Sequence, residues 1–145
     1  MRWKPPALLL AILLAATPVF ASSPSPQLGS ADATAIHEVI EAQLRAFRSD
    51  DSVQAFAYAS PAIQSIFKNA DTFMSMVRAG YKPVYRPQEV EFRDLVPVEG
   101  RWTQRVLLVG PDGVPIVAQY VMEKQPDGSW RIDGCLLERS TEQTT

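Results

Sequence analysis

The sequence is poor in the residues that most often build metal sites and redox centres: it has one cysteine and one histidine among 145 residues. Cys135 cannot form a disulfide within the chain, so it is either a buried thiol or half of an intermolecular bond. We favour a buried, inert thiol, because His37 falls on a predicted helix with no evident route to it. No metal-ligand cluster, glycine-rich phosphate loop or nucleophile motif is present, so the sequence predicts no metal and no cofactor.

Clusters of basic residues are also missing. The chain carries 14 Lys and Arg against 16 Asp and Glu. Two of the basic residues, Arg2 and Lys4, fall in a segment that we expect to be removed, which leaves 12 basic residues and a formal charge of −4. A chain with this charge and no basic patch is a poor partner for nucleic acid.

Long hydrophobic runs are confined to the start of the chain. Residues 1–21 have the layout of a signal peptide: a charged end, an apolar run over residues 7–16, and small residues before a cleavage site after Ala21. The run is short for a membrane span, and an uncleaved anchor is the alternative. The sequence therefore predicts an exported protein, periplasmic or secreted, with no stable membrane span after cleavage.

The rest of the composition is that of a globular protein, with 46% hydrophobic and 21% charged residues. We predict a flexible serine- and proline-rich lead-in over residues 22–31, one domain over residues 32–137 and a polar tail over residues 138–145. The domain is long enough to bury a real core.

Four helices are predicted in the first half of the domain. Their start signals are, in order, Ser30 or Asp32, Asp50 or Asp51, Ser60 before Pro61, and Asn69 or Asp71. The first helix is expected to run to about Arg48 with an apolar stripe on one side. The third should turn Ile63, Ile66 and Phe67 inward, and Gly80 should end the fourth with a left-handed torsion.

The stretch from Tyr81 to Pro87 contains two prolines, so we expect it to be extended or irregular. It presents three polar-tipped side chains, those of Tyr81, Tyr85 and Arg86. Such a segment can fold over the mouth of a core and carry a binding function. The alternative is a plain connector whose tyrosines pack against the sheet.

Residues 89–137 have the pattern of four strands joined by three tight turns. Two turns have the sequence Pro-Asp-Gly, at residues 111–113 and 126–128, which favours a three-residue hairpin loop with a glycine bulge. This loop type places Gly110 opposite Val114, and the same rule fixes the register of the last hairpin.

Side chains alternate along each strand, so this register defines two faces. The predicted core face is almost entirely apolar: Trp102, Gln104, Val106, Leu108, Ile116, Ala118, Tyr120, Met122, Trp130, Ile132, Gly134 and Leu136. The opposite face mixes polar residues with Leu107, Val109, Val117, Val121, Cys135 and Leu137. Few elements remain to cover that face, so a homodimer through it is plausible.

The turn at residues 99–100 fits two registers. We choose the one that sends the apolar residues of the first strand to the core: Val90, Phe92, Val96 and Val98. A one-residue slip would expose all four. The chosen register also sends Asp94 inward, whereas a bulge at residues 94–95 would turn it outward.

Three polar side chains therefore interrupt the predicted core face: Asp94, Gln104 and Tyr120. Gln104 and Tyr120 are expected to be cross-strand partners, and Gly134 leaves space beside Tyr120. Buried polar groups need partners, so this group is either a satisfied core network, which is the simpler interpretation, or the lining of a pocket.

Helices followed by a curved antiparallel sheet make an α+β layout with the helices on one face. This order resembles the nuclear transport factor 2-like (cystatin-like) cone, which ketosteroid isomerase shares. Residues 127–134 resemble the last hairpin of that superfamily. The isomerase needs a carboxylate base and paired hydrogen-bond donors, and only Asp94 and Tyr120 are candidates here, so its chemistry is not carried over.

A closer resemblance, over about residues 36–137, is to an uncharacterised bacterial family, domain of unknown function 4864. The matching residues are Gln43-Leu44-Arg45-Ala46-Phe47, Asp50-Asp51, Phe56, Ala59-Ser60-Pro61, Ile63-Gln64, Phe67, Phe73, Met76-Val77, Gly80-Tyr81, Arg86-Pro87 and Asp133-Gly134. The resemblance implies the cone fold and no known activity.

Three functions compete. The favoured one is a non-catalytic exported module that binds a small apolar or amphipathic ligand. Its candidate lining is Met74, Met76, Tyr81, Tyr85, Arg86, Gln104 and Tyr120. The second is an isomerase- or hydratase-like enzyme with Asp94 as base or buried acid, assisted by Tyr120 and Gln104. The third is a structural or assembly protein that acts through a sheet-face dimer.

Overall fold

The computed structural model describes residues 18–19, 21–22, 24 and 26–141. The signal peptide predicted over residues 1–21 lies almost entirely outside the described residues, as does the end of the predicted tail, residues 142–145. Within the described part of the chain, no helix has the length and hydrophobicity that crossing a membrane requires.

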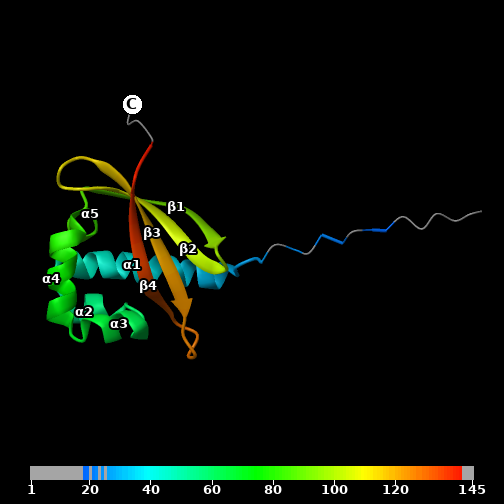
Figure 1. The fold of residues 1–145 in the computed structure, drawn as a ribbon, viewed down its shortest axis with the longest axis horizontal. Helices are drawn as coiled ribbons and strands as arrows, with labels where there is room; N and C mark the ends of the chain where they lie inside the picture. Colours follow the sequence, from blue (N-terminus) through cyan, green and yellow to red (C-terminus); the bar gives the residue numbers. More distant parts are fainter. Residues whose placement is uncertain (1–17, 20, 23, 25, 142–145) are drawn as a thin grey trace, which may run out of the picture.

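In the described residues, five helices precede a sheet of four strands. The helices are α1 (Ser30–Arg48), α2 (Ser52–Ala57), α3 (Pro61–Phe67), α4 (Ala70–Gly80) and α5 (Lys82–Tyr85). The strands are β1 (Glu89–Val98), β2 (Arg101–Val109), β3 (Pro115–Lys124) and β4 (Trp130–Arg139). This order confirms the predicted α+β class. Figure 1 shows α1 lying across one face of the twisted sheet, with α2, α3, α4 and α5 grouped at one end of it.

Three of the helices begin at their predicted caps. The side chains of Asp51, Ser60 and Asn69 accept hydrogen bonds from the backbone N–H groups of Gln54, Ile63 and Thr72. Such bonds satisfy amides that the helix itself leaves unpaired. The starts of α2, α3 and α4 are therefore determined by single capping residues next to each helix.

Helix α1 begins differently from the prediction, because its N-cap is Gly29 and no side chain caps it. Asp32 instead points to the last hairpin, where it accepts a hydrogen bond from the Trp130 indole N–H at 2.9 Å and pairs with the Lys124 ammonium group at 3.1 Å. These contacts tie the start of α1 to the ends of β3 and β4.

The segment after α4 also differs from the prediction. Gly80 is the last helical residue and is not left-handed, and Tyr81 interrupts the helix with φ −130° and ψ 45°. The chain then forms the short helix α5, where an extended segment was expected. Pro83 stands in the first turn of α5, where a missing N–H costs nothing, so proline does not prevent the helix.

The four strands form one antiparallel sheet in the order β1-β2-β3-β4. The Gly110 N–H donates to the Val114 carbonyl at 3.3 Å, as the predicted hairpin requires, and Gly113 takes the left-handed φ of 76°. Gln104 lies opposite Tyr120, which confirms the register predicted between β2 and β3.

A bulge in β1 makes the prediction for Asp94 wrong. Phe92 pairs with Val106 but Leu95 pairs with Gln104, so the extra residue resets the alternation of side chains. Asp94 is exposed and forms an ion pair with Arg105 at 3.4 Å. The bulge lies at residues 93–94, one position before the alternative considered at residues 94–95, and it has the effect expected of that alternative: Asp94 faces out and Leu95 faces in.

The bulge also makes the predictions for Val96 and Val98 wrong, because both follow it in the strand. Val90 and Phe92 pack against the core as expected, and Leu95 joins them. Val96 and Val98 share the face opposite to Leu95, and Val98 is 43% exposed.

A second bulge, in β4, overturns the faces predicted for its last residues. Met122 pairs with Ile132 but Val121 pairs with Gly134, so Asp133 is the additional residue. Cys135 now lies opposite Tyr120 and packs against the core with Leu137. Leu136, expected in the core, is 60% exposed.

The core lies between the helices and the inner face of the sheet. The apolar stripe of α1 is buried as predicted through Ile36, Ile40, Leu44 and Phe47. Phe73 of α4 is the centre of an aromatic cluster, with its ring centroid 6.2 Å, 5.3 Å and 5.6 Å from those of Phe47, Phe56 and Phe67. None of the described helices covers the outer face of the sheet (Figure 1).

Candidate functional site

A pocket of about 330 Å³ lies between α3, α4, α5 and the inner side of β4. Its walls come from every described helix except α2, and no charged side chain among the described residues belongs to them. The lining residues are Gln43, Phe47, Ala59, Ile63, Ile66, Phe67, Phe73, Met76, Val77, Tyr81, Val84, Tyr120, Ile132, Gly134, Cys135 and Leu136.

Local structure explains the apolar walls. On α4, Phe73, Met76 and Val77 follow helical spacing and share one face. On β4, the bulge turns Cys135 toward the core. Ile66 and Leu136 are 68% and 60% exposed although they line the pocket, so they form an apolar rim at its mouth. The prediction that Ile66 points into the core is therefore wrong.

Two polar side chains of the pocket wall have backbone partners. The Tyr81 hydroxyl donates to the Cys135 carbonyl at 3.2 Å, which ties the start of α5 to β4. The Gln43 amide donates to the Ala55 carbonyl at 3.0 Å, which ties α1 to α2. The first bond joins two parts of the wall, and the second fastens the wall helix α1 to α2.

Tyr120 is the exception. Its side chain lines the pocket and is 1% exposed, and its hydroxyl has no hydrogen-bond partner among the described residues. Burial raises the pKa of this hydroxyl well above its usual value, and the neighbouring Cys135 thiol adds to the rise. A thiol is a weak hydrogen-bonding group, so it does not replace the water that the hydroxyl has lost.

Cys135 lies opposite Tyr120 in the strand pair and contributes to the same wall. Burial raises the pKa of its thiol from 9.0 to about 12. Since the thiolate is the nucleophile, this shift lowers the reactivity expected of the thiol at neutral pH. The residue is partly buried, whereas a fully buried thiol was expected.

The structure divides the seven candidate pocket residues. Met76, Tyr81 and Tyr120 line the pocket. Met74 lies in the core at 1% exposure. Gln104 is buried elsewhere, and its amide donates to the carbonyls of Arg93 and Arg105 at 2.9 Å and 3.0 Å.

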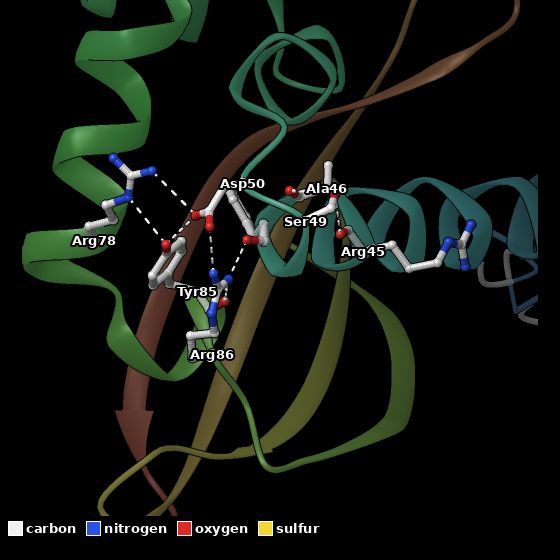
Figure 2. A network of polar contacts seen from close by, with 8 residues as sticks. Arg45, Ala46, Ser49, Asp50, Arg78, Tyr85 and Arg86 are labelled. Carbon is white, nitrogen blue, oxygen red and sulfur yellow. Dashed lines mark hydrogen bonds and ion pairs between the residues drawn. The ribbon is translucent and has the colours of Figure 1, made fainter.

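Tyr85 and Arg86, the last two candidates, belong to a surface network outside the pocket (Figure 2). Asp50 is its centre: it pairs with Arg78 at 3.3 Å and Arg86 at 3.0 Å, and it accepts a hydrogen bond from the Tyr85 hydroxyl. Arg86 also donates to the Phe47 carbonyl at the end of α1. The Tyr85 hydrogen bond, followed by the two guanidinium groups, holds the pKa of Asp50 below its usual value despite some desolvation.

This network fastens α4 and α5 to the end of α1, so it positions one wall of the pocket from outside. Asp50 has a φ of 54°, in the left-handed region that aspartate tolerates better than most residues. Sequence reasoning read Asp50 as a cap and missed its partners, because they lie 28 to 36 positions away.

A second positioning contact was also missed. Asp133, the bulge residue of β4, accepts a hydrogen bond from the Ser60 hydroxyl at 2.6 Å and pairs with Arg101. Burial alone would raise the pKa of Asp133, but the Ser60 hydrogen bond and the Arg101 charge outweigh it and lower that pKa. The contact fixes the start of α3, another wall. Gly134 inside a strand pattern was the available signal, since such a glycine often marks a bulge.

Among the residues that the structure describes, no carboxylate lines the pocket, and Asp94 lies on the outside of the sheet. The arrangement therefore lacks the buried acid on which the enzyme hypothesis depended. Within the described ranges, no group of three or more His, Cys, Asp or Glu side chains could hold a metal ion.

Comparison with known proteins gives a family and no activity. Neither a curated protein nor a solved structure matches the chain, so the likeness to the nuclear transport factor 2-like cone stays a prediction. The family model "Domain of unknown function (DUF4864)" matches residues 29–145, which are most of the sequence. The chain therefore belongs to the DUF4864 family.

Proposed function

We propose that this protein is a non-catalytic module that binds a small apolar or amphipathic molecule in the pocket between α3, α4, α5 and β4. The observation that carries the proposal is an apolar pocket of about 330 Å³ lined by Tyr120, whose buried hydroxyl has no hydrogen-bond partner among the described residues. Protein cores are close-packed and their buried polar groups are almost always paired. A bound molecule accounts for both departures at once.

The pocket has the other properties of a ligand site. Apolar walls with a few polar groups are typical of such sites, and its volume is at the lower end of their usual range. The apolar rim formed by Ile66 and Leu136 gives a ligand a route in from solvent. Asp50 and Asp133 brace the walls, which favours a pocket that exists before the ligand arrives.

Protein-observed NMR with a panel of small apolar compounds tests the proposal. We expect shifts of the methyl signals of Met76 and Val77, together with a rise in melting temperature. Met76→Trp should fill the pocket and abolish both responses. Ser75→Trp is the matched control, because Ser75 is exposed on the same helix and outside the lining, and it should bind as the wild type does.

Native mass spectrometry of protein purified from its own host is an independent test of ligand binding. A small molecule retained by the wild type and lost from Met76→Trp would support the proposal and identify the ligand's chemistry. If no compound of suitable size shifts the pocket signals and the purified protein carries nothing, the pocket is only a packing defect.

Export is part of the proposal and rests on residues 1–21 of the sequence, which predict cleavage after Ala21. The binding site would then operate in a periplasm or outside the cell. Expression of the full sequence in a bacterial host, followed by N-terminal sequencing of the periplasmic fraction, tests this part. A protein found intact in the cytoplasm would contradict it.

A homodimer through the outer sheet face is a further proposal. That face carries Leu107, Val117 and Val121 between charges of both signs, such as Arg105 and Glu123, so a second copy could match it. Light scattering should give twice the monomer mass, and Val117→Arg should halve it. A wild-type monomer at high concentration would exclude the dimer and leave the pocket proposal untouched.

A further inference from the structure

The pocket also carries information about which class of ligand it takes. This inference rests on the proposed function and adds the polarity of the ligand, its size and its orientation. Three observations supply these properties: the absence of charge in the walls, the volume, and the state of the Tyr120 hydroxyl.

The walls select against a charged ligand. None of the lining side chains carries a charge. Three arginines on or beside elements that border the pocket are already engaged: Arg78 and Arg86 pair with Asp50, and Arg101 pairs with Asp133. A carboxylate or ammonium group brought into this site would lose its hydration and gain no opposite charge, which is strongly unfavourable.

The volume limits the size of the ligand. A dry apolar cavity of about 150 Å³ is enough to hold benzene. At about 330 Å³, this pocket is roughly twice as large, so it suits a molecule with about a dozen non-hydrogen atoms.

The Tyr120 hydroxyl supplies the polar requirement. It is buried and, apart from a weak contact with the Cys135 sulfur, has no hydrogen-bond partner among the described residues, whereas the other wall hydroxyl, that of Tyr81, is already bonded to the Cys135 carbonyl. The only polar group beside it is the Cys135 sulfur, which is a weak acceptor, so the hydroxyl proton still lacks a strong acceptor among the described residues. The group that a ligand should bring is therefore an acceptor.

From these observations we infer that the pocket takes an uncharged molecule with an apolar body of about a dozen non-hydrogen atoms and one carbonyl-type oxygen that accepts a hydrogen bond from Tyr120. The oxygen lies at the inner end of the pocket, against β3. The apolar end lies toward the rim formed by Ile66 and Leu136.

Three probes of one shape test this assignment. Benzylacetone carries a ketone, hydrocinnamate carries a carboxylate and isopentylbenzene carries only carbon at the same end of the same skeleton. NMR titration of the wild-type protein at neutral pH should give tightest binding for benzylacetone, about fivefold weaker binding for isopentylbenzene, and no measurable binding for hydrocinnamate.

Two tyrosine variants assign the preference to one hydroxyl. Tyr120→Phe should remove the preference for benzylacetone over isopentylbenzene and leave binding of the hydrocarbon intact. Tyr58→Phe is the matched control, because Tyr58 lies outside the pocket lining, and it should keep the preference.

The outcomes separate this inference from the proposed function. If none of the three probes binds, the proposed function itself fails. If isopentylbenzene binds as well as benzylacetone, if hydrocinnamate binds best, or if Tyr120→Phe keeps the ketone preference, the pocket binds ligands but the assigned class is wrong. The wild-type comparison of the three probes decides the class even if Tyr120→Phe does not fold.

Discussion

The side-chain amide of Gln104 donates a hydrogen bond to the backbone carbonyl of Arg93 at 2.9 Å, directly at the bulge of β1. The same nitrogen lies 3.3 Å from the Asp94 carbonyl. A bulge leaves backbone groups without ladder partners, and this buried amide satisfies them. The Gln104 side chain therefore stabilises the bulge that turns Asp94 away from the core. It lies opposite Tyr120 in the strand pair, but its amide bonds to the bulge and not to the Tyr120 hydroxyl.

Replacement of Gln104 tests this role. Gln104→Leu should lower the free energy of unfolding by about 1–3 kcal/mol, because the carbonyls at the bulge would be buried without a donor. Gln119→Leu, on the outer face of β3, should change it by less than about 0.5 kcal/mol. Urea denaturation of both variants measures the difference, and equal effects would show that the amide does not support the bulge.

The two tyrosines of the pocket should respond in opposite directions when each loses its hydroxyl. Tyr81→Phe removes a hydrogen bond to Cys135 and should destabilise the ligand-free protein by about 1 kcal/mol. Tyr120→Phe removes a buried hydroxyl that has no hydrogen-bond partner among the described residues, so it should stabilise the ligand-free protein by up to about 1 kcal/mol.

Thermal and urea unfolding of ligand-free protein measure both effects. If the Tyr120 hydroxyl lowers the stability of the ligand-free protein, it behaves as expected of a group that functions in binding. A loss of stability in Tyr120→Phe comparable to that in Tyr81→Phe would mean that the Tyr120 hydroxyl has a partner, and the pocket inference would lose its main support.

Cys135 should be almost inert in the folded protein. Because burial raises the pKa of its thiol from 9.0 to about 12, the thiolate fraction near pH 8 should be roughly a thousandfold smaller than in the unfolded chain. Titration with a disulfide reagent should give one slow thiol without denaturant and one fast thiol in urea. Rapid reaction of the native protein would contradict the buried position of the sulfur.

Stability in acid should depend on Asp133. Its pKa is lower in the folded protein than the ordinary value of 3.8, so its carboxylate contributes stability that is present above that value and is lost as the pH falls through the folded pKa. Asp133→Asn should be less stable than wild type by about 1 kcal/mol near neutral pH. Urea denaturation between about pH 5 and pH 2 should show this difference shrinking toward zero. A gap that stays constant with pH would indicate that the charge of Asp133 is irrelevant.

The network around Asp50 should be sensitive to salt. Asparagine also tolerates the left-handed backbone at this position, so Asp50→Asn isolates the charge. We expect a lower melting temperature than wild type at low ionic strength, and a smaller gap in concentrated salt, because screening weakens exposed ion pairs. Asp94→Asn breaks the single exposed pair with Arg105 and should have little effect at any salt concentration.

Helix starts and tight turns could be predicted because their causes lie within a few residues. The caps at Asp51, Ser60 and Asn69 need only an acceptor beside the first helical amides. The glycine turn at Gly113 needs only a residue that accepts a positive φ. From these local rules follow the α+β class and the register that places Gln104 opposite Tyr120.

The sequence alone therefore determined the first four helices and the four strands, their order, the register of β2 with β3, and the membership of Tyr120 in the core. The tertiary structure decided where the strands bulge, and with that which side Asp94, Cys135 and Leu136 face. A bulge costs little locally, so its position depends on contacts with residues elsewhere in the fold. The Gln104 amide bonds to the bulge in β1, and the Ser60 hydroxyl bonds to the bulge residue of β4. The pocket depends on the same choices, because its walls come from segments that meet only after the chain has folded.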